Sequence, residues 1–284
     1  IRVSGAGSDC VEKFFSTTES AALFPEYVAR AVRQGIGEAD VLERIVATKT
    51  VIDGMDYRSI ASNPGEDKKA LRRVAEGAAI PETTVTTQEN LVKLYKRGRM
   101  LVASYEAVRF AKLDLFTVTL RQIGAYIASA QLDDAVRVLT DGDGNSNPIT
   151  SIATGTAGGI SYQNLVALWQ ALDPYSLNTL IASPAVIAKL LCIDELKDAV
   201  AGLNFQGTGK LVTPLGAVIV KANAAQDAII GIDKGFALEM VSAQEVSIDY
   251  DRLIDRQLER AAVTSIAGFA KIFTDASKRL TLTE

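Results

Sequence analysis

The chain has 284 residues, of which 48% are hydrophobic and 23% are charged, and its formal net charge at pH 7 is -4. This composition is typical of a globular protein with one large or two modest domains, and it excludes a strongly basic surface that wraps nucleic acid tightly. No stretch approaches the twenty or so apolar residues of a membrane-spanning helix, so we expect a soluble, cytosolic protein with no membrane partner.

The chain has no histidine and only two cysteines, Cys10 and Cys192. The absence of histidine removes the most common general base and the most common metal ligand, which excludes most hydrolytic mechanisms. The two cysteines give no disulfide framework or metal knuckle, and Cys192 is expected to be a buried, small apolar residue. We therefore predict no catalytic residue, no cofactor and no metal site, and we do not expect an enzyme.

The first predicted element is an arm over residues 1–18 that is rich in Ser, Gly and Thr. Such a segment cannot bury the adjacent rings of Phe14 and Phe15 by itself, so both are predicted to contact another subunit. The chain opens with Ile1 where a newly made protein has methionine, which favours cleavage of a preceding segment.

A short helix over residues 21–37 is expected to anchor the arm, because Pro25 suits its first turn. The β-branched residues 41–52 then predict a strand that runs out to a turn, and residues 83–94 predict a returning strand. Between them the sequence is dense in charges of both signs, which indicates the tip of a two-stranded arm. An isolated two-stranded hairpin is marginal in water, so we expect this arm to lie on a neighbouring subunit. Its candidates for intersubunit ion pairs are Arg58, Arg72, Arg73 and Glu76.

A long amphipathic helix is predicted over about residues 104–140. Ser104 is a suitable N-cap, apolar residues recur near a helical spacing from Val108 to Val138, and Asp141-Gly142 ends the pattern. An uninterrupted helix of that span would be about 50 Å long, which exceeds what a compact domain of this size needs. A long spine that carries a projecting arm suits assembly better than catalysis.

Two short motifs resemble ligand-binding loops but lack essential residues. Asp141–Pro148 has the oxygen-bearing side chains of a calcium loop, but Ser146 stands where that loop needs glycine. Gly207–Lys210 resembles a phosphate-binding loop, but Asn204 and Leu211 replace its first glycine and its magnesium-binding hydroxyl. We interpret the first motif as a helix-ending turn and the second as a hairpin turn.

A change of character near residue 150 predicts a domain boundary. Beyond it, residues 161–172 and 184–196 have helical spacing and residues 177–182 predict a buried strand, which together indicate a small α/β domain. The C-terminal part is strand-like and is expected to return to the first domain. Its charged run over residues 249–256 is interpreted as a solvated or intersubunit ion-pair face. The strand-like segments are residues 237–240, 246–248 and 263–273.

Four phrases along the chain resemble parts of one known family. Leu23–Tyr27 resembles its junction between arm and body, and Glu76–Glu82 resembles the phrase that closes its extended loop. Leu139–Gly144 resembles the end of its spine helix, and Asp255–Phe273 resembles its C-terminal strands. Their order along the whole chain is a stronger signal than any one phrase, and it resembles that of the major capsid proteins of tailed bacteriophages with the Hong Kong 97 capsid fold, in their mature, processed form.

The resemblance implies an α+β chain with a Hong Kong 97-like capsid fold. Precursors in this family often lose an N-terminal scaffolding segment, which fits a chain that begins with Ile1. The parts that it implies are an N-terminal arm and anchoring helix (1–35), a peripheral domain (36–151 and 235–284) with an extended β-hairpin loop (about 52–91) and a spine helix (about 104–140), and an axial α/β domain (152–234).

The implied function is that of a structural major capsid protein, which self-assembles as pentamers and hexamers into an icosahedral shell around phage double-stranded DNA. The expected partners are further copies of the chain, DNA contacted without sequence specificity, a portal, a scaffold or maturation protease, and a decoration protein. The expected location is the virion capsid, assembled in the cytoplasm of the host bacterium.

Some members of the family crosslink a lysine of the extended loop to an asparagine near the C-terminus of a neighbouring subunit. Lys68 and Lys69 would supply the amine here, but no asparagine follows Asn223 in the chain. We therefore predict a shell that is held together by non-covalent contacts.

Two alternatives remain open. An encapsulin-like protein nanocompartment shares the fold and would enclose cargo proteins in place of a genome. A carboxylate-dependent enzyme of the second domain would have to use Asp173, Asp194 and Glu195, and a soluble monomer with turnover would favour it.

Overall fold

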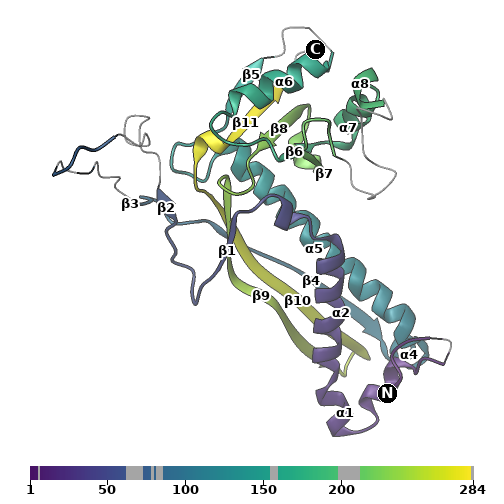
Figure 1. Ribbon diagram of the computed structural model, residues 1–284. Helices are drawn as coiled ribbons and strands as arrows, with labels where there is room; N and C mark the ends of the chain where they lie inside the picture. Colours follow the sequence, from purple (N-terminus) through teal and green to yellow (C-terminus); the bar gives the residue numbers. More distant parts are fainter. Residues whose placement is uncertain are drawn as a thin grey trace. The chain divides into compact units, whose positions relative to one another are not determined.

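The computed structural model describes residues 1–5, 7–61, 73–77, 80, 86–153, 159–197 and 212–282 (Figure 1). The α-helices are α1 (Thr18–Ala22), α2 (Phe24–Ala39), α4 (Tyr105–Phe110), α5 (Leu113–Asp141), α6 (Tyr162–Ala171), α7 (Pro184–Leu191) and α8 (Asp194–Lys197), and the 3₁₀ helices are η1 (Val11–Phe15), η2 (Leu42–Arg44), η3 (Asn223–Ala225) and η4 (Thr274–Ala276). The strands are β1 (Thr48–Val51), β2 (Ile60–Ala61), β3 (Thr86–Thr87), β4 (Leu94–Ser104), β5 (Thr150–Ala153), β6 (Thr179–Ala182), β7 (Val218–Lys221), β8 (Ala228–Ile232), β9 (Leu238–Leu253), β10 (Leu258–Lys271) and β11 (Ser277–Thr281). No helix in these described ranges is long and apolar enough to cross a membrane.

The chain divides into two compact units. Three long elements, α5, β9 and β10, contribute residues to both units, so the chain passes from one unit to the other within continuous secondary structure. Unit 1 comprises Ile1–Val41, Leu94–Leu132 and Ser242–Gly268, and unit 2 comprises Leu42–Lys93, Asp133–Val241 and Phe269–Glu284.

In unit 1, α2 and α5 pack against one face of the sheet that β4, β9 and β10 form (Figure 1). β10 pairs antiparallel with β4, from Leu258 opposite Ser104 to Gly268 opposite Leu94. Buried and half-buried positions alternate along most of β10, because successive side chains of a strand point to opposite faces of a sheet. The core of this unit includes Val28, Val32, Leu113, Leu120, Ile123, Ile127 and Val263.

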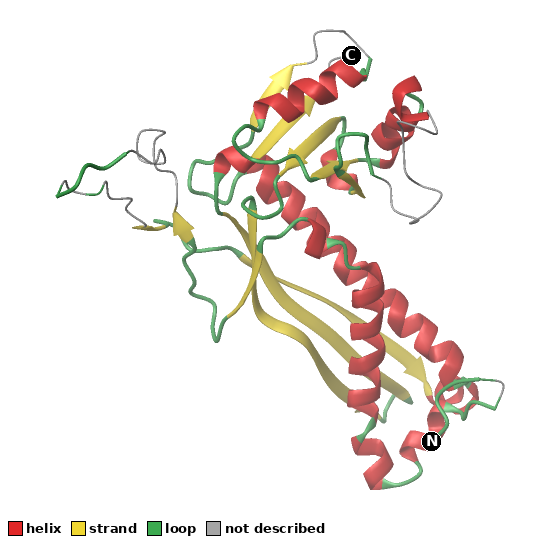
Figure 2. Cartoon of the chain, viewed as in Figure 1, coloured by secondary structure: helices red, strands yellow, loops and turns green. Residues whose placement is uncertain are grey.

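In unit 2, five strands form a sheet in the order β5-β11-β8-β6-β7 (Figure 2). β6 and β8 are buried along their whole length, and α6 and α7 pack on this sheet through residues such as Leu168 and Leu190. The predicted buried strand and the helix before it are therefore confirmed. The helix predicted over residues 184–196 is two helices, because α7 ends at Leu191 and α8 begins at Asp194. The last strand, β11, pairs with β5 and β8, so part of the C-terminal β-structure belongs to the sheet of unit 2.

The predicted spine is not one uninterrupted helix. Ser104 caps α4 as expected, since its side chain accepts a hydrogen bond from the backbone N–H of Ala107, but α4 ends at Phe110. The chain is extended at Ala111, whose carbonyl accepts from the N–H of Val11 at 3.0 Å. The N-terminal segment thus pairs with the interruption, and sequence periodicity cannot reveal such a non-local bond. The predicted end is correct, because α5 stops at Asp141 and Gly142 has a φ of +89°.

Three further predictions differ from the structure. The β-branched segment 41–52 contains the 3₁₀ helix η2 before the short strand β1. The two strand-like segments 237–240 and 246–248 are parts of one continuous strand, β9, which also includes the first charged residues of the run that begins at Asp249. Cys192 is exposed and not buried, because α7 ends there and the chain turns into α8.

Candidate functional site

The aromatic pair of the N-terminal arm lies inside unit 1. Phe14 is 4% exposed, and its ring centroid lies 5.6 Å from that of Phe24 at the start of α2. Phe15 is half-buried and stacks on Tyr250 of β9, with the centroids 5.9 Å apart. The arm does not bury these rings by itself, because η1 places Phe14 in the core beside α2 and packs Phe15 partly against β9 of the same subunit. Phe14 therefore has little surface left for a second subunit. Contact of these rings with another subunit stays a prediction.

The charged candidates of the extended loop are only partly within the described ranges. Arg58, Arg73 and Glu76 are described and exposed. No ion pair formed within the described ranges joins these three residues to one another. The remaining candidates, Lys68, Lys69 and Arg72, lie outside the described residues, as does the phosphate-loop-like motif Gly207–Lys210.

The edge strand β4 exposes apolar side chains on one face of the sheet in unit 1. Met100 is 53% exposed and Val102 is 50% exposed. Their neighbours Leu101 and Ala103 point to the other face and pack against the core. An apolar pair on the open face of an edge strand is typical of a surface that another chain covers.

Helix α5 also has an exposed apolar side within unit 1. Leu115, Val118 and Tyr126 are 69%, 57% and 58% exposed. Their spacing places them on one side of the helix, opposite the buried Leu120 and Ile127. This side of α5 is a second candidate contact surface.

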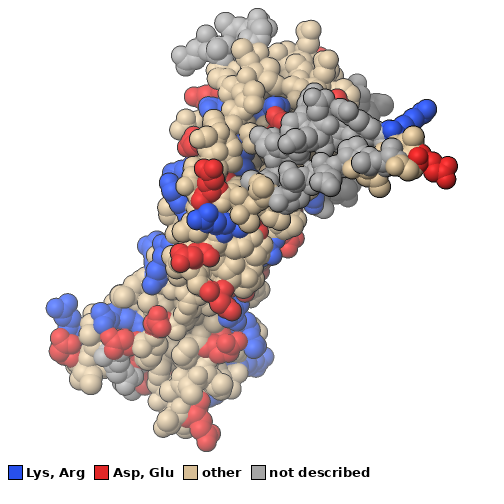
Figure 3. Space-filling model, turned by 90° about the vertical axis from the view of Figure 1, so that its left-hand side faces the viewer, with Lys and Arg blue, Asp and Glu red and all other residues tan. Residues whose placement is uncertain are grey.

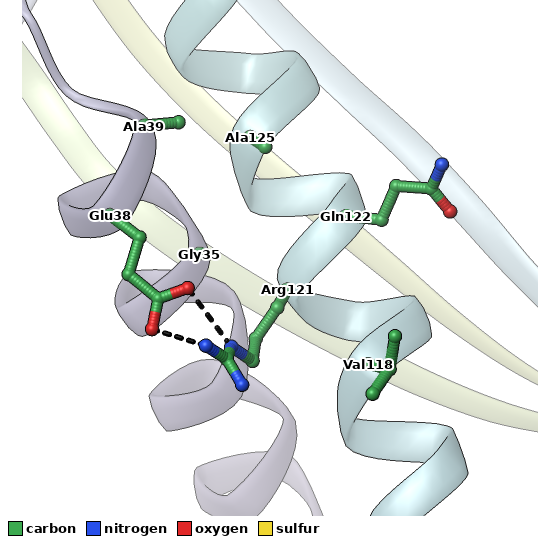
Figure 4. Close-up of a pocket in the computed structure, with 7 residues that line it drawn as sticks. All are labelled: Gly35, Glu38, Ala39, Val118, Arg121, Gln122 and Ala125. Atoms are coloured by element: carbon green, nitrogen blue, oxygen red, sulfur yellow. Dashed lines mark hydrogen bonds and ion pairs between the residues drawn. The ribbon is translucent and has the colours of Figure 1, made fainter.

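Between α2 and α5 lies a shallow groove (Figure 4). Across it, the guanidinium group of Arg121 donates two hydrogen bonds to the carboxylate of Glu38, with Nε 3.1 Å from Oε2. These bonds hold the pKa of Glu38 below its usual value and raise the pKa of Arg121. The lining residues are Gly35, Glu38, Ala39, Val118, Arg121, Gln122 and Ala125.

In unit 2, a buried carboxylate accepts hydrogen bonds from three hydroxyl groups. Glu239 of β9 is 6% exposed, and it accepts hydrogen bonds from Thr50 Oγ1 at 2.5 Å, from Tyr57 OH at 2.8 Å and from Ser59 Oγ. Burial and the bond to this carboxylate together raise the pKa of Tyr57. All three donors precede β2, so we call Glu239 and its donors the outgoing cluster.

A second buried network in unit 2 holds the residues that follow β3. Asp143 accepts hydrogen bonds through Oδ2 from Gln88 Nε2 and from the backbone N–H of Lys271, both at 3.0 Å, and Asn145 donates to its Oδ1. The ammonium group of Lys271 donates to the carbonyls of Leu139 at 3.1 Å and Asn147 at 2.9 Å. Burial lowers the pKa of Lys271 to about 8, although the nearby charge of Asp143 opposes the shift. We call this set the returning cluster.

Sequence reasoning missed both clusters. The helix-ending turn after Asp141 was expected, but its loop also supplies the buried carboxylate of Asp143. One signal was present in the sequence, because Glu239 and Lys271 are single charges within apolar runs, and a charge in such a run needs a partner when the strand is buried. The partners themselves come from distant parts of the chain.

The remaining candidates for ligand binding or catalysis are carboxylate and thiol side chains. Within the described ranges, no group of three or more Cys, Asp or Glu side chains is placed to hold a metal ion. Asp173, Asp194 and Glu195, the carboxylates considered for an enzyme, are all exposed, and the last two lie in the first turn of the short helix α8. On the face drawn in Figure 3, basic and acidic side chains are interspersed.

Comparison with family models matches residues 87–271 to the family described as phage capsid protein. The fold is similar to the virus-like particle from Pyrococcus furiosus, with a TM-score of 0.59, 14% identity, and coverage of 90% of this chain and 98% of that chain. It is similar to the capsid of an empty GTA particle, with a TM-score of 0.58, 17% identity, and coverage of 87% and 90%. It is also similar to the SrpI encapsulin from Synechococcus elongatus, with a TM-score of 0.56, 11% identity, and coverage of 84% and 85%. A sequence comparison with curated proteins found no match.

The α+β architecture and its structural neighbours define a Hong Kong 97-like capsid fold. Because the family match covers more than half of the residues, the chain belongs to the phage capsid protein family. This membership points to a structural protein, with a place in a capsid, and the fold and family predicted from the sequence are confirmed.

Proposed function

We propose that the chain is the major capsid protein of a tailed bacteriophage, which assembles as pentamers and hexamers into an icosahedral shell around double-stranded DNA. The match of residues 87–271 to the phage capsid family carries this proposal. Pentamers and hexamers of this kind are closed rings of identical subunits. Head-to-tail contacts close into such rings when the rotation between subunits permits it.

The exposed surfaces of unit 1 support assembly. Met100 and Val102 on β4, and Leu115 and Tyr126 on α5, remain at least half exposed in the single subunit. Burial of such side chains favours association, and many modest interfaces make a strong closed shell. Further contacts in this proposal come from the charged loop candidates Arg58, Lys68, Lys69, Arg72, Arg73 and Glu76, and from Phe15.

The proposal includes the roles of the parts and the partners. The N-terminal arm, the peripheral domain with its extended loop, and the axial domain have the functions that their counterparts have in capsids of this fold. Interspersed charges such as those in Figure 3 suit loose, non-specific contact with packaged DNA. Portal, scaffold or maturation protease and decoration protein are the further partners, and assembly takes place in the cytoplasm of the host bacterium.

Electron microscopy of particles from the native source, combined with an assay of nuclease-protected DNA in the same sample, tests this function. Icosahedral shells that protect DNA are the expected result. A monomer of 30.3 kDa that forms no particles at high concentration would overturn the proposal.

An encapsulin-like nanocompartment is the second candidate. The likeness to the SrpI encapsulin, which extends over 84% of this chain, favours it at the level of the fold. The content of the particles separates the two functions, because a compartment would contain cargo protein and no protected DNA.

A further inference from the structure

The outgoing cluster makes the burial of Glu239 conditional on the position of residues 50–59. A buried carboxylate is tolerated only when hydrogen-bond donors replace the water that it loses. Here the donors are hydroxyl groups of Thr50, Tyr57 and Ser59. If this segment left the body of unit 2, the carboxylate would lose all three of these donors at once. These three hydrogen bonds to the carboxylate of Glu239 therefore hold the segment in place.

The returning cluster likewise holds the residues that follow β3 in place by hydrogen bonds to a buried carboxylate. The Gln88 side chain is 5% exposed and donates both to Asp143 Oδ2 and to the carbonyl of Lys271, each at 3.0 Å. Its own Oε1 accepts from Asn145 Nδ2 at 3.1 Å. Both the amide nitrogen and the amide oxygen of Gln88 thus form hydrogen bonds with the body of unit 2. The side chain of Asn90 donates a further hydrogen bond of 2.8 Å to the carbonyl of Gly144.

Backbone hydrogen bonds join the outgoing cluster to the returning cluster, and we call the joined clusters the base. The N–H of Gln88 donates to the carbonyl of Ser59 at 2.8 Å, and the N–H of Val92 donates to that of Tyr57 at 2.8 Å. The short strands β2 and β3 pair next to the bond between Gln88 and Ser59, with Ile60 opposite Thr87. Movement of either side of the base therefore disturbs hydrogen bonds of both clusters.

We propose that Glu239 and Asp143 are positioning residues for assembly, which set in the free subunit the direction in which the chain departs at β2 and re-enters at β3. This inference rests on the proposed assembly function. A closed shell repeats one contact geometry many times, so each subunit must offer the same orientation to its neighbour. A base that is ordered before association also lowers the entropy that association has to remove.

The test compares Glu239→Gln with Glu89→Gln in the purified full chain. Glu89 lies in the returning segment and is exposed, so its variant controls for the loss of a carboxylate from this region. We expect Glu239→Gln to raise the threshold concentration for shell formation at least tenfold and to speed amide hydrogen exchange at Gln88 and Val92 at least tenfold. Glu89→Gln is expected to leave both quantities within twofold of wild type.

A urea unfolding curve separates positioning from a purely structural role. Positioning predicts that folded Glu239→Gln subunits assemble poorly, whereas a structural role predicts a lower unfolding midpoint and a normal threshold for the subunits that are folded. Wild-type exchange and threshold in Glu239→Gln would overturn the inference. If that variant does not fold, Tyr57→Phe and Ser59→Ala remove single donors, and wild-type exchange and threshold in both would overturn it equally. If wild-type chains form no shells, the proposed function fails, while the exchange data still decide whether Glu239 holds the base.

Discussion

Gly35 of α2 and Gly124 of α5 face each other where the two helices cross. A Cβ atom added to Gly124 would lie 3.0 Å from the carbonyl carbon of Gly35 and only 2.2 Å from the carbonyl oxygen of Val32. A Cβ atom on Gly35 would lie 2.0 Å from the carbonyl oxygen of Arg121. Both obstacles are backbone atoms that cannot rotate away, so the helices approach this closely only because neither residue has a side chain.

Substitution Gly124→Ala is expected to destabilise the subunit by about 3 kcal/mol, because the helices must move apart and loosen the core between them. Gly37→Ala is the matched control, since it lies in the same helix α2 as Gly35 and a Cβ atom there meets nothing within 4 Å. Its higher helix propensity should stabilise the subunit by about 0.5 kcal/mol. Urea unfolding measures both, and equal effects of the two variants would contradict the crossing argument.

Lys271 is expected to make stability rise with pH above neutrality. Burial lowers its pKa to about 8, whereas an unfolded chain keeps the proton to a pH of about 10.4. Between these values the unfolded state binds more protons, so the free energy of unfolding increases with pH. The neutral amine still has two hydrogens for the carbonyls of Leu139 and Asn147, so deprotonation keeps both bonds.

The measurement is urea unfolding of wild type and Lys271→Met at pH 7 and pH 9.5. The wild type should gain about 2 kcal/mol relative to the variant over this interval, because one pKa unit corresponds to roughly 1.4 kcal/mol. Lys221→Met, which removes an exposed lysine of β7, is the control. Its free energy of unfolding should change between the two pH values by the same amount as that of the wild type. A constant difference between wild type and Lys271→Met would show that Lys271 does not titrate in this range.

The open face of β4 is expected to matter for assembly and not for folding. The double substitution Met100→Gln and Val102→Thr changes exposed side chains, so subunit stability should stay within about 0.5 kcal/mol of wild type. Light scattering should show a marked rise in the threshold concentration for shell formation. The contrasting variant Leu101→Ala, on the face that packs against the core, should lower stability by about 2 kcal/mol. Normal assembly of the double variant would exclude this face from the shell contacts.

Charge reversal in the extended loop is expected to impair shell formation and to leave the subunit folded. Replacement of Arg72 and Arg73 by Glu would place negative charges where we propose intersubunit ion pairs. The paired replacement by Lys keeps the charge and should assemble, although exposed ion pairs contribute only about 0–1 kcal/mol each. Electron microscopy together with circular dichroism checks this, and normal shells from the Glu variant would refute the proposed contacts.

The shell is expected to dissociate completely in denaturant. No asparagine follows Asn223, so the acceptor for a crosslink to Lys68 or Lys69 is missing from the C-terminal part. Denaturing electrophoresis of purified particles should therefore give one band at the mass of a single chain. A ladder of higher bands, with isopeptide-linked peptides identified by mass spectrometry, would contradict this.

Much of unit 2 was predictable because its signals are local. The side chains of Ser161 and Ser183 cap α6 and α7, and the apolar run between these helices forms the buried strand β6. The position of the N-terminal aromatic pair was not predictable, because an arm and a short helix that folds back have the same composition. Phe14 is buried because its ring packs against that of Phe24, and this contact depends on how α2 packs in the folded subunit.

The sequence by itself determined the class of fold, the end of the long helix at Gly142 and the order of the elements, because periodicity, caps and turns act over a few residues. Only the tertiary structure decided the interruption of the spine at Ala111 and the crossing at Gly124. It also decided the partners of Glu239, which come from residues 180 to 189 positions away in the chain. These features depend on hydrogen bonds and close contacts between distant segments, and the folded backbone alone brings those segments together.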